Sequence, residues 1–308
     1  TDDESEADVA VVNSCCFIND AKEESINTIL QLAELKKEGQ LKALIVCGCL
    51  AQRYQDEIRT EIPEVDAIMG TTAIDRIVET VEEVLAGRGK NHLEDIDRPC
   101  VYGTPRSVTT GGHFAYLKIA EGCNKRCTYC IIPSVRGNYR SLVREAKKLV
   151  EGGAKELILV AQETTVYGVD LYGEKMLPEL LRKLCAIDGL VWIRLLYCYP
   201  EEITEELIQV MKQEPKICHY LDMPIQHASD KILAKMGRRT RREELEGIIG
   251  RLREEIPDIC LRTTLISGFP GETEKDHEEL LDFVNLMEFD RLGVFTYSQE
   301  ENTPAAEM

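Results

Sequence analysis

The sequence has no run of 18 or more apolar residues, although 44% of its 308 residues are hydrophobic. A helix that crosses a bilayer needs about 20 such residues, so we expect no membrane span. Residues 1–8 are acidic and contain neither the basic nor the apolar region of a signal peptide, which argues against secretion. These absences, with a length sufficient for about two domains, predict a cytoplasmic globular protein.

Basic residues are scarce relative to acidic ones. The chain has 37 Lys and Arg against 55 Asp and Glu, which gives a formal net charge of −18. Such a chain is poorly suited to bind phosphate backbones, because nucleic-acid affinity comes largely from basic side chains. The charge therefore favours a basic partner and makes tRNA a less expected one.

A second closely spaced cysteine or histidine pair is missing after the trio Cys123, Cys127 and Cys130, and the next cysteine is Cys185. Structural zinc uses four ligands, usually as two pairs, so this pattern disfavours zinc. Three thiols spaced C-x3-C-x2-C on one loop instead favour an iron–sulfur cluster that leaves one iron open. The alternatives are a zinc site and a set of inert, buried cysteines.

The cysteine content is high, at twelve residues, in a chain that is neither small nor loop-rich. Disulfide frameworks are typical of small secreted domains, so metal or redox chemistry is the better explanation. Cys100 has no partner nearby in the sequence and is interpreted as incidental.

Strands and helices alternate in the first 88 residues, which indicates a small parallel α/β domain. In the first helix Ile26, Ile29, Leu30 and Ala33 have the spacing of a buried face. Two strands end in cysteines, at residues 15–16 and 47–49, so the carboxyl edge of the sheet is a candidate metal site. The alternative is that these four cysteines fill the core. The expected strands are 8–13, 41–46 and 67–69, and the expected helices are 20–37, one from about 50, and 74–85.

Residues 88–112 interrupt the periodicity with Gly, Pro and Thr, which indicates a linker with a short hairpin. Six strand–helix units follow and predict an incomplete parallel barrel, in which function gathers at the carboxyl ends of the strands. In the last helix Leu280, Leu281, Val284 and Met287 form the expected apolar face, and residues 273 and 276 resemble a capping box. The expected strands are 114–119, 156–161, 191–196, 220–222, 260–266 and 291–297, and the expected helices are 142–151, 177–186, 205–213, 242–254 and 273–287.

Polar residues and glycine follow several of these strands, where ligand contacts belong in such a barrel. The candidates are Gln162, Glu163, Gln226, His227, Arg262, Ile266 and Gly268. A single histidine such as His227 is more often structural than a ligand. The basic stretch 238–242 is more often a solvated turn than a contact surface.

The segment CNKRCTYC resembles the cluster motif of radical S-adenosylmethionine enzymes. The segments VVNSCCFINDAKEES, VCGCLAQRY, AQETTVYGVDLYG, MPIQHASDKILAKMGRRT and RTTLISGFPGETE together resemble the methylthiotransferases of that group. Within them the chain is most similar to the branch that modifies an aspartate of ribosomal protein S-twelve. The fold that this implies is α/β, with a small parallel α/β domain at 1–88, a linker at 89–112 and a partial (β/α)6 radical-SAM barrel at 113–308.

The resemblance implies that Cys123, Cys127 and Cys130 hold a [4Fe-4S] cluster that binds S-adenosylmethionine. Cys15 and Cys49 match ligands of a second, auxiliary [4Fe-4S] cluster, whereas Cys16 and Cys47 match no ligand position. The remaining assignments come from the same resemblance. Glu163, where the family usually has Asp, would contact the amino group of the cofactor, Tyr129 would flank its adenine, and Gln162, Gln226, Arg262, Ile266 and Gly268 would complete its site.

The resemblance also implies an enzyme that inserts sulfur and a methyl group at the β-carbon of the aspartate, with flavodoxin or ferredoxin as electron donor. The pair 226–227 distinguishes it from the tRNA-modifying branch, which remains one alternative. A non-catalytic iron–sulfur or zinc module is the other. The family's first auxiliary-cluster cysteine and its C-terminal β-barrel domain have no counterpart here. We therefore expect a fragment truncated at both ends, with an incomplete auxiliary cluster.

Overall fold

The computed structural model describes residues 3–96, 98, 107–120, 122–123, 125–135 and 143–308, so Cys100 lies outside the described residues. The chain divides into two compact units. The first contains Thr1–Thr104, Cys130–Gly137 and Ser298–Thr303, and the second contains Pro105–Tyr129, Asn138–Tyr297 and Pro304–Met308.

The first unit is built on a three-stranded parallel sheet with the order β1-β2-β3. Its strands are β1 (Val9–Ser14), β2 (Ala43–Gly48) and β3 (Ala67–Met69). Its helices are η1 (Glu4–Glu6), α1 (Asn19–Lys37), α2 (Cys49–Arg53), α3 (Gln55–Glu61), η2 (Ile74–Arg76) and α4 (Ile77–Leu85). The alternation of strands and helices expected for this part of the chain is confirmed.

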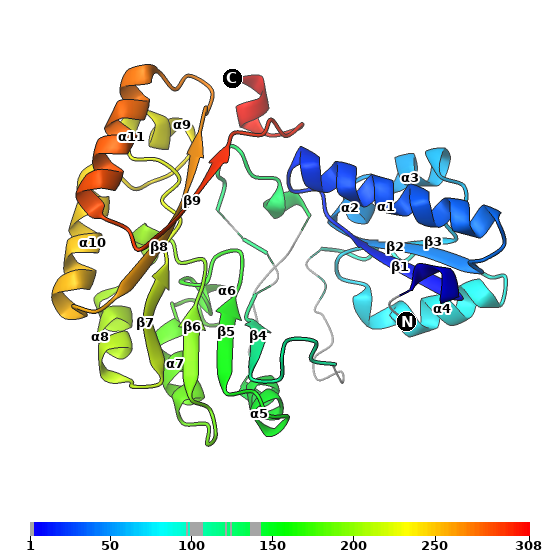
Figure 1. The fold of residues 1–308 in the computed structure, drawn as a ribbon, viewed down its shortest axis with the longest axis horizontal. Helices are drawn as coiled ribbons and strands as arrows, with labels where there is room; N and C mark the ends of the chain where they lie inside the picture. The colour runs from blue at the N-terminus through cyan, green and yellow to red at the C-terminus, as the bar shows by residue number, and fades with distance from the viewer. Residues whose placement is uncertain (1–2, 97, 99–106, 121, 124, 136–142) are drawn as a thin grey trace. The chain divides into compact units, whose positions relative to one another are not determined.

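Strand β2 is buried at all six positions because helices cover both faces of the sheet. Leu44 and Val46 pack in one core with Ile29 and Leu32 of α1, whereas Ile45 packs on the opposite face beside α4. Figure 1 shows α1 and α4 on opposite sides of this sheet. A strand enclosed on both faces reads as a continuous apolar run, which is the pattern of residues 43–46.

The buried face of α1 differs from the expected one. Ile29 and Ala33 are buried as predicted, but Ile26 and Leu30 are 41% and 45% exposed, so their assignment to the core was wrong. Leu32 takes part in the core instead. Helical spacing places 26 and 30 on one stripe, and contact with β1 and β2 selects the neighbouring stripe.

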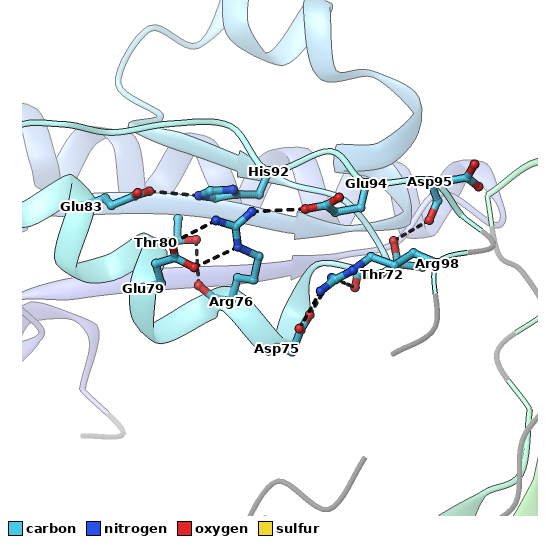
Figure 2. A network of polar contacts seen from close by, with 10 residues as sticks. All are labelled: Thr72, Asp75, Arg76, Glu79, Thr80, Glu83, His92, Glu94, Asp95 and Arg98. Atoms are coloured by element: carbon cyan, nitrogen blue, oxygen red, sulfur yellow. Dashed lines mark hydrogen bonds and ion pairs between the residues drawn. The ribbon is translucent and has the colours of Figure 1, made fainter. Parts of the chain in front are cut away.

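Residues 91–98 also belong to the first unit. The His92 N–H donates to Ile68 O at 2.9 Å, and the Gly70 N–H donates to His92 O at 2.8 Å. Polar side chains join this stretch to η2 and α4 (Figure 2). Arg98 contacts Asp75 at 2.9 Å, and His92 contacts Glu83 at 3.0 Å. These contacts hold residues 92 and 98 against the sheet edge at β3 and the helices that follow it.

The second unit is built on a six-stranded parallel sheet with the order β4-β5-β6-β7-β8-β9, as the repeated strand–helix pattern predicts. The strands are β4 (Phe114–Lys118), β5 (Glu156–Val160), β6 (Trp192–Leu195), β7 (Ile217–Asp222), β8 (Cys260–Ser267) and β9 (Arg291–Thr296). The helices are η3 (Ile132–Ser134), α5 (Val143–Glu151), α6 (Val169–Tyr172), α7 (Leu177–Cys185), η4 (Pro200–Glu202), α8 (Glu205–Gln213), α9 (Asp230–Lys235), α10 (Arg242–Glu255), α11 (Glu274–Met287) and η5 (Pro304–Glu307).

The core of the second unit lies between this sheet and its helices. Alternate strand residues such as Leu117, Leu159 and Leu195 are completely buried and pack with α7 residues such as Leu184. Because side chains alternate across a strand, the residues between them face the other side of the sheet and are less buried. The curved sheet with helices on its outer side is visible in Figure 1 and forms a partial barrel.

Helix α11 begins with the capping box that the sequence predicts. The Asp276 N–H donates to Thr273 Oγ1 at 3.3 Å, and the Thr273 N–H donates to Asp276 Oδ2 at 2.9 Å. The apolar face is confirmed at Leu280, but Leu281 is 51% exposed and Phe283 is buried in its place. The short helices α6 and α9 were not predicted, because four to six residues show too little periodicity.

Among the described residues, no helix has both the length and the apolar character needed to cross a membrane.

Candidate metal and cofactor site

Cys123 and Cys127 follow β4 at the carboxyl edge of the six-stranded sheet, whereas Cys130 belongs to the first unit. Cys123 and Cys127 are buried, with 7% and 6% of their surfaces exposed, and Cys130 is half-buried. The Thr128 N–H donates to Met236 O at 3.0 Å, which fixes the loop against the end of α9. Gly237 permits this approach, since it has φ of +70° and a Cβ there would lie 3.0 Å from Arg126 O.

The thiols of Cys123 and Cys127 have different surroundings. The Lys125 backbone N–H donates to Cys123 Sγ at 3.3 Å, and burial raises the pKa of this thiol to about 11. Cys127 Sγ lies 3.5 Å from the hydroxyl of Tyr199, which follows β6. No cluster of three Cys, His, Asp or Glu side chains poised to hold a metal ion occurs within the described ranges.

Lys125 and Arg238 place two positive charges beside the Tyr199 ring. Lys125 Nζ lies 5.3 Å from the ring centroid and pairs with Glu202 and, at 3.4 Å, with Glu201. Arg238 Cζ lies 4.0 Å from the same centroid. The interpretation of residues 238–242 as a solvated turn was wrong for Arg238, which is only 6% exposed because it packs on this ring.

Glu163 follows β5 and is completely buried, whereas Gln162 beside it is exposed. Its Oε1 accepts hydrogen bonds from the Thr165 hydroxyl and from the Thr165 N–H, the latter at 2.9 Å. Burial raises the pKa of the Glu163 carboxyl to about 7, although the hydrogen bonds and Lys125 favour its charged form. The structure thus places a buried carboxyl near Cys123.

Tyr129 and Ile266 lie in one apolar cluster with Phe269. The Tyr129 and Phe269 rings meet edge to face with centroids 6.5 Å apart. Gly268 has φ of +77°, and its N–H donates to Glu272 Oε2 at 2.6 Å. The structure thus brings Tyr129, Ile266 and Gly268 to the end of β8. The hydrogen bond to Glu272 holds the loop that contains the glycine.

The backbone of Gln226 continues the parallel pairing with β8 beyond the end of β7, and Gln226 has a positive φ of 70°. Its N–H donates to Thr264 O at 2.9 Å, and its O accepts from the Ile266 N–H at 2.8 Å. Its side-chain Oε1 is buried and has no hydrogen-bond partner among the described residues. A positive φ outside glycine is costly and marks a position that the surrounding structure holds.

His227 and Arg262 are both engaged with neighbouring groups. His227 is completely buried, its Nδ1 accepts from the Ser229 N–H at 3.0 Å, and burial lowers its pKa. This arrangement fits a structural histidine. Arg262 pairs with Asp222 at 2.5 Å, so its charge is already balanced inside the sheet.

The cysteines of the first unit lie at the carboxyl ends of β1 and β2. Cys15 is exposed and Cys49 is half-buried, whereas Cys16 and Cys47 are buried. Gly48 has φ of +98° and lets the end of β2 lie close to the end of β1, since a Cβ at this position would clash with Ser14 O. Burial is the main reason that the pKa of the Cys16 thiol is raised to about 11, and the electrostatic effect of the nearby Cys49 is the second.

Tyr199 and Arg238 lie beside the thiol loop, and the sequence did not identify either of them as a site residue. Tyr199 lies 72 residues after Cys127, and no local pattern links them. For Arg238, the signal in the sequence was its position directly after Gly237, and this glycine packs against the thiol loop. Their proximity depends on the neighbouring positions of the strand ends.

Comparisons with known proteins agree with this arrangement. A sequence profile of the radical SAM superfamily matches residues 117–284, and one of the uncharacterized protein family UPF0004 matches residues 1–70. The radical S-adenosylmethionine methyltransferase TsrM of Kitasatospora setae shares the fold, with a TM-score of 0.68 at 15% identity, over 97% of this chain and 66% of that protein.

Relatives of high sequence identity are ribosomal protein uS12 methylthiotransferases. RimO of Lachnoclostridium phytofermentans is 68% identical over 100% of this chain and 71% of its own length. RimO of Clostridioides difficile is 55% identical over 97% of this chain and 69% of its own length. This chain therefore belongs to the ribosomal protein uS12 methylthiotransferase family of the radical SAM superfamily.

Proposed function

We propose that this chain is a methylthiotransferase that inserts sulfur and a methyl group at the β-carbon of an aspartate of ribosomal protein uS12. The observation that carries the proposal is the 68% identity, over the whole chain, to a relative named for uS12 methylthiotransfer. When bound, an iron–sulfur cluster and S-adenosylmethionine supply the radical chemistry that an unactivated carbon requires and that no side chain provides.

Cys123, Cys127 and Cys130 would hold the cluster that binds S-adenosylmethionine. Cys123 and Cys127 carry free thiols, and thiolates are the ligands that iron–sulfur clusters use. The buried Arg238 next to Cys127 has two nitrogen atoms, Nε and Nη1, without a hydrogen-bond partner among the described residues. A thiolate-bound cluster is anionic and would offset this charge, so the residues fit the group in donor type and in charge.

Glu163 would accept a hydrogen bond from the cofactor's amino group, since its buried carboxyl lies near Cys123. Tyr129 would flank the adenine, with Ile266 in the same apolar cluster. Gln162, Gln226, Arg262 and Gly268 would complete the cofactor site. The side-chain Oε1 of Gln226 supports its part in this list, because a buried oxygen without a partner is costly unless a ligand donates to it.

Cys15 and Cys49 would bind an auxiliary [4Fe-4S] cluster at the carboxyl edge of the first sheet. They are the two more accessible cysteines of the four at this edge. Two thiols leave further ligand positions for groups other than these. Flavodoxin or ferredoxin would deliver electrons, and the cytoplasm would be the compartment.

The domain organisation would be a methylthiotransferase domain at 1–88, a linker at 89–112 and a radical-SAM barrel at 113–308. The barrel supplies buried side chains that position the cofactor and exclude water around it. The net charge of −18 supports a basic protein substrate over tRNA, which remains the alternative within this chemistry.

Anaerobic cluster reconstitution tests the reaction class. The reconstituted protein with dithionite and S-adenosylmethionine should form 5′-deoxyadenosine, and Cys127→Ala should not, whereas the control Cys260→Ser on β8 should. A wild-type protein with a full complement of iron but no 5′-deoxyadenosine would exclude radical chemistry.

Mass spectrometry then identifies the substrate. Incubation with ribosomal protein uS12 should yield an aspartate that is heavier by one methylthio group in place of hydrogen, and incubation with tRNA should yield no modified nucleoside. The opposite outcome would favour the tRNA alternative.

A further inference from the structure

Arg238 is a buried cation with no carboxylate partner in the part of the chain that the structure describes. Its side chain donates one hydrogen bond, from Nη2 to Pro224 O at 2.9 Å. Nearby Glu201 and Glu202 are already engaged by Lys125. Because an unbalanced buried charge is costly, the position of Arg238 calls for a negative group close by.

The ring of Tyr199 connects Arg238 to the thiol loop. The guanidinium carbon lies 4.0 Å from the ring centroid, which is the distance of a close cation–π contact. The hydroxyl of the same ring lies 3.5 Å from Cys127 Sγ. One aromatic side chain thus contacts a buried cation with its face and a candidate cluster ligand with its hydroxyl.

We propose that Tyr199 and Arg238 are positioning residues for the cluster, with the Tyr199 hydroxyl donating a hydrogen bond to the Cys127 thiolate and Arg238 serving as the counter-charge. The proposal rests on the proposed function for the identity of the cluster, and it assigns these two residues a task that the function alone does not require. The stacked guanidinium also fixes the plane of the ring, so the hydroxyl stays directed at the sulfur.

Both contacts favour the reduced cluster. Reduction adds one electron, from dithionite or from the physiological donor, and makes the cluster more negative. A hydrogen bond to a ligand sulfur and a nearby positive charge each stabilise that extra charge. Loss of either contact should therefore lower the midpoint potential, since the oxidised cluster carries less negative charge.

Redox titration followed by electron paramagnetic resonance measures this effect. In Tyr199→Phe we expect the reduction equilibrium constant to fall about tenfold, which corresponds to about 59 mV for one electron. Arg238→Gln should lower it at least as much, and Arg238→Lys, which keeps the charge, should lower it less. The affinity for S-adenosylmethionine should remain within about twofold of wild type in Tyr199→Phe.

The second unit contains a matched control. Arg194 Cζ lies 4.9 Å from the centroid of Tyr220, so this pair makes a longer cation–π contact of the same kind, and no described hydrogen bond joins its hydroxyl to a cysteine of the trio. Tyr220→Phe should leave the midpoint potential unchanged. Thermal unfolding of every variant, with iron content per chain, separates an effect on the cluster from a loss of folding.

Three outcomes would overturn the inference. An unchanged midpoint potential in Tyr199→Phe and Arg238→Gln, with full iron content, refutes it and leaves the proposed function intact. An unchanged potential with weakened S-adenosylmethionine binding in Arg238→Gln would instead assign Arg238 to the cofactor's carboxylate. A wild-type chain that takes up no cluster at the trio refutes both proposals together.

Discussion

The two cysteine regions of this protein differ in how the fold surrounds their thiols. In the second unit Cys123 and Cys127 are buried, and Tyr199, Lys125 and Glu163 lie around them. In the first unit Cys15 is exposed and Cys49 is half-buried. The barrel thus provides an environment of hydrogen bonds and charges for its thiols. The small sheet mainly brings the ends of two strands together, so its cluster would depend more on ligands other than these two thiols.

The largest effect is expected when one cysteine of each region is replaced by alanine. Cys127→Ala should abolish 5′-deoxyadenosine formation, because two thiols cannot replace three at the cluster that binds S-adenosylmethionine. Cys49→Ala should retain 5′-deoxyadenosine but form no methylthiolated product. Iron content and chromatographic product analysis measure both effects. Loss of 5′-deoxyadenosine in both variants would show that the two regions are not independent.

A buried ion pair holds the first unit around its cysteines. Glu300 is 2% exposed, and its Oε1 accepts from Arg53 at 2.6 Å and from Lys22 at 3.1 Å. Glu300→Ala should lower the free energy of unfolding by about 3–5 kcal/mol, because Lys22 and Arg53 lose this buried carboxylate, although Arg53 keeps its contacts with Glu301. Denaturant unfolding measures it, and Glu206→Ala, at an exposed ion pair, should cost no more than about 1 kcal/mol. Equal losses in the two variants would contradict the importance of burial.

Glu163 should make the stability of the second unit depend on pH. Its pKa is raised from 4.5 to about 7, so the folded state binds more protons than the unfolded state between these values. The contribution is therefore most favourable below pH 4.5 and falls as the pH rises to about 7, by about 3 kcal/mol in total.

Glu163→Gln keeps the Thr165 hydrogen-bond acceptor and should remove this dependence. Unfolding of the metal-free protein at about pH 5 and about pH 8 should then show a smaller difference for the variant than for wild type. The exposed Glu206→Gln should behave as wild type. A wild-type difference that persists in Glu163→Gln would assign the pH dependence to other groups.

The smallest effect distinguishes neighbouring thiols of the first unit. Cys15 is exposed, whereas Cys16 is buried and has a pKa of about 11. Alkylation requires an accessible thiolate, so iodoacetamide should label Cys15 at least about tenfold faster than Cys16 at about pH 8. Peptide mass spectrometry of the metal-free protein gives both rates, and the urea-unfolded chain, with both thiols exposed, is the control. Equal labelling of the folded chain would contradict the buried position of Cys16.

Much of the fold could be predicted because its signals are local. The apolar run at residues 157–160 and the capping box of Thr273 with Asp276 each involve residues close in sequence. The errors at Ile26 and Leu281 have another origin. An amphipathic helix has several apolar stripes, and the sheet on which it packs determines which stripe is buried.

The sequence by itself determined the alternation of strands and helices, the positions of the thiols along the chain and the family, since spacing and periodicity depend on neighbouring residues. Only the tertiary structure decided that Arg238 is buried and that Tyr199 reaches Cys127. These residues follow different strands, and the parallel sheet brings their ends to one edge. The contact of Tyr199 with Cys127, 72 positions apart, arises from that packing, which no local pattern in the chain encodes.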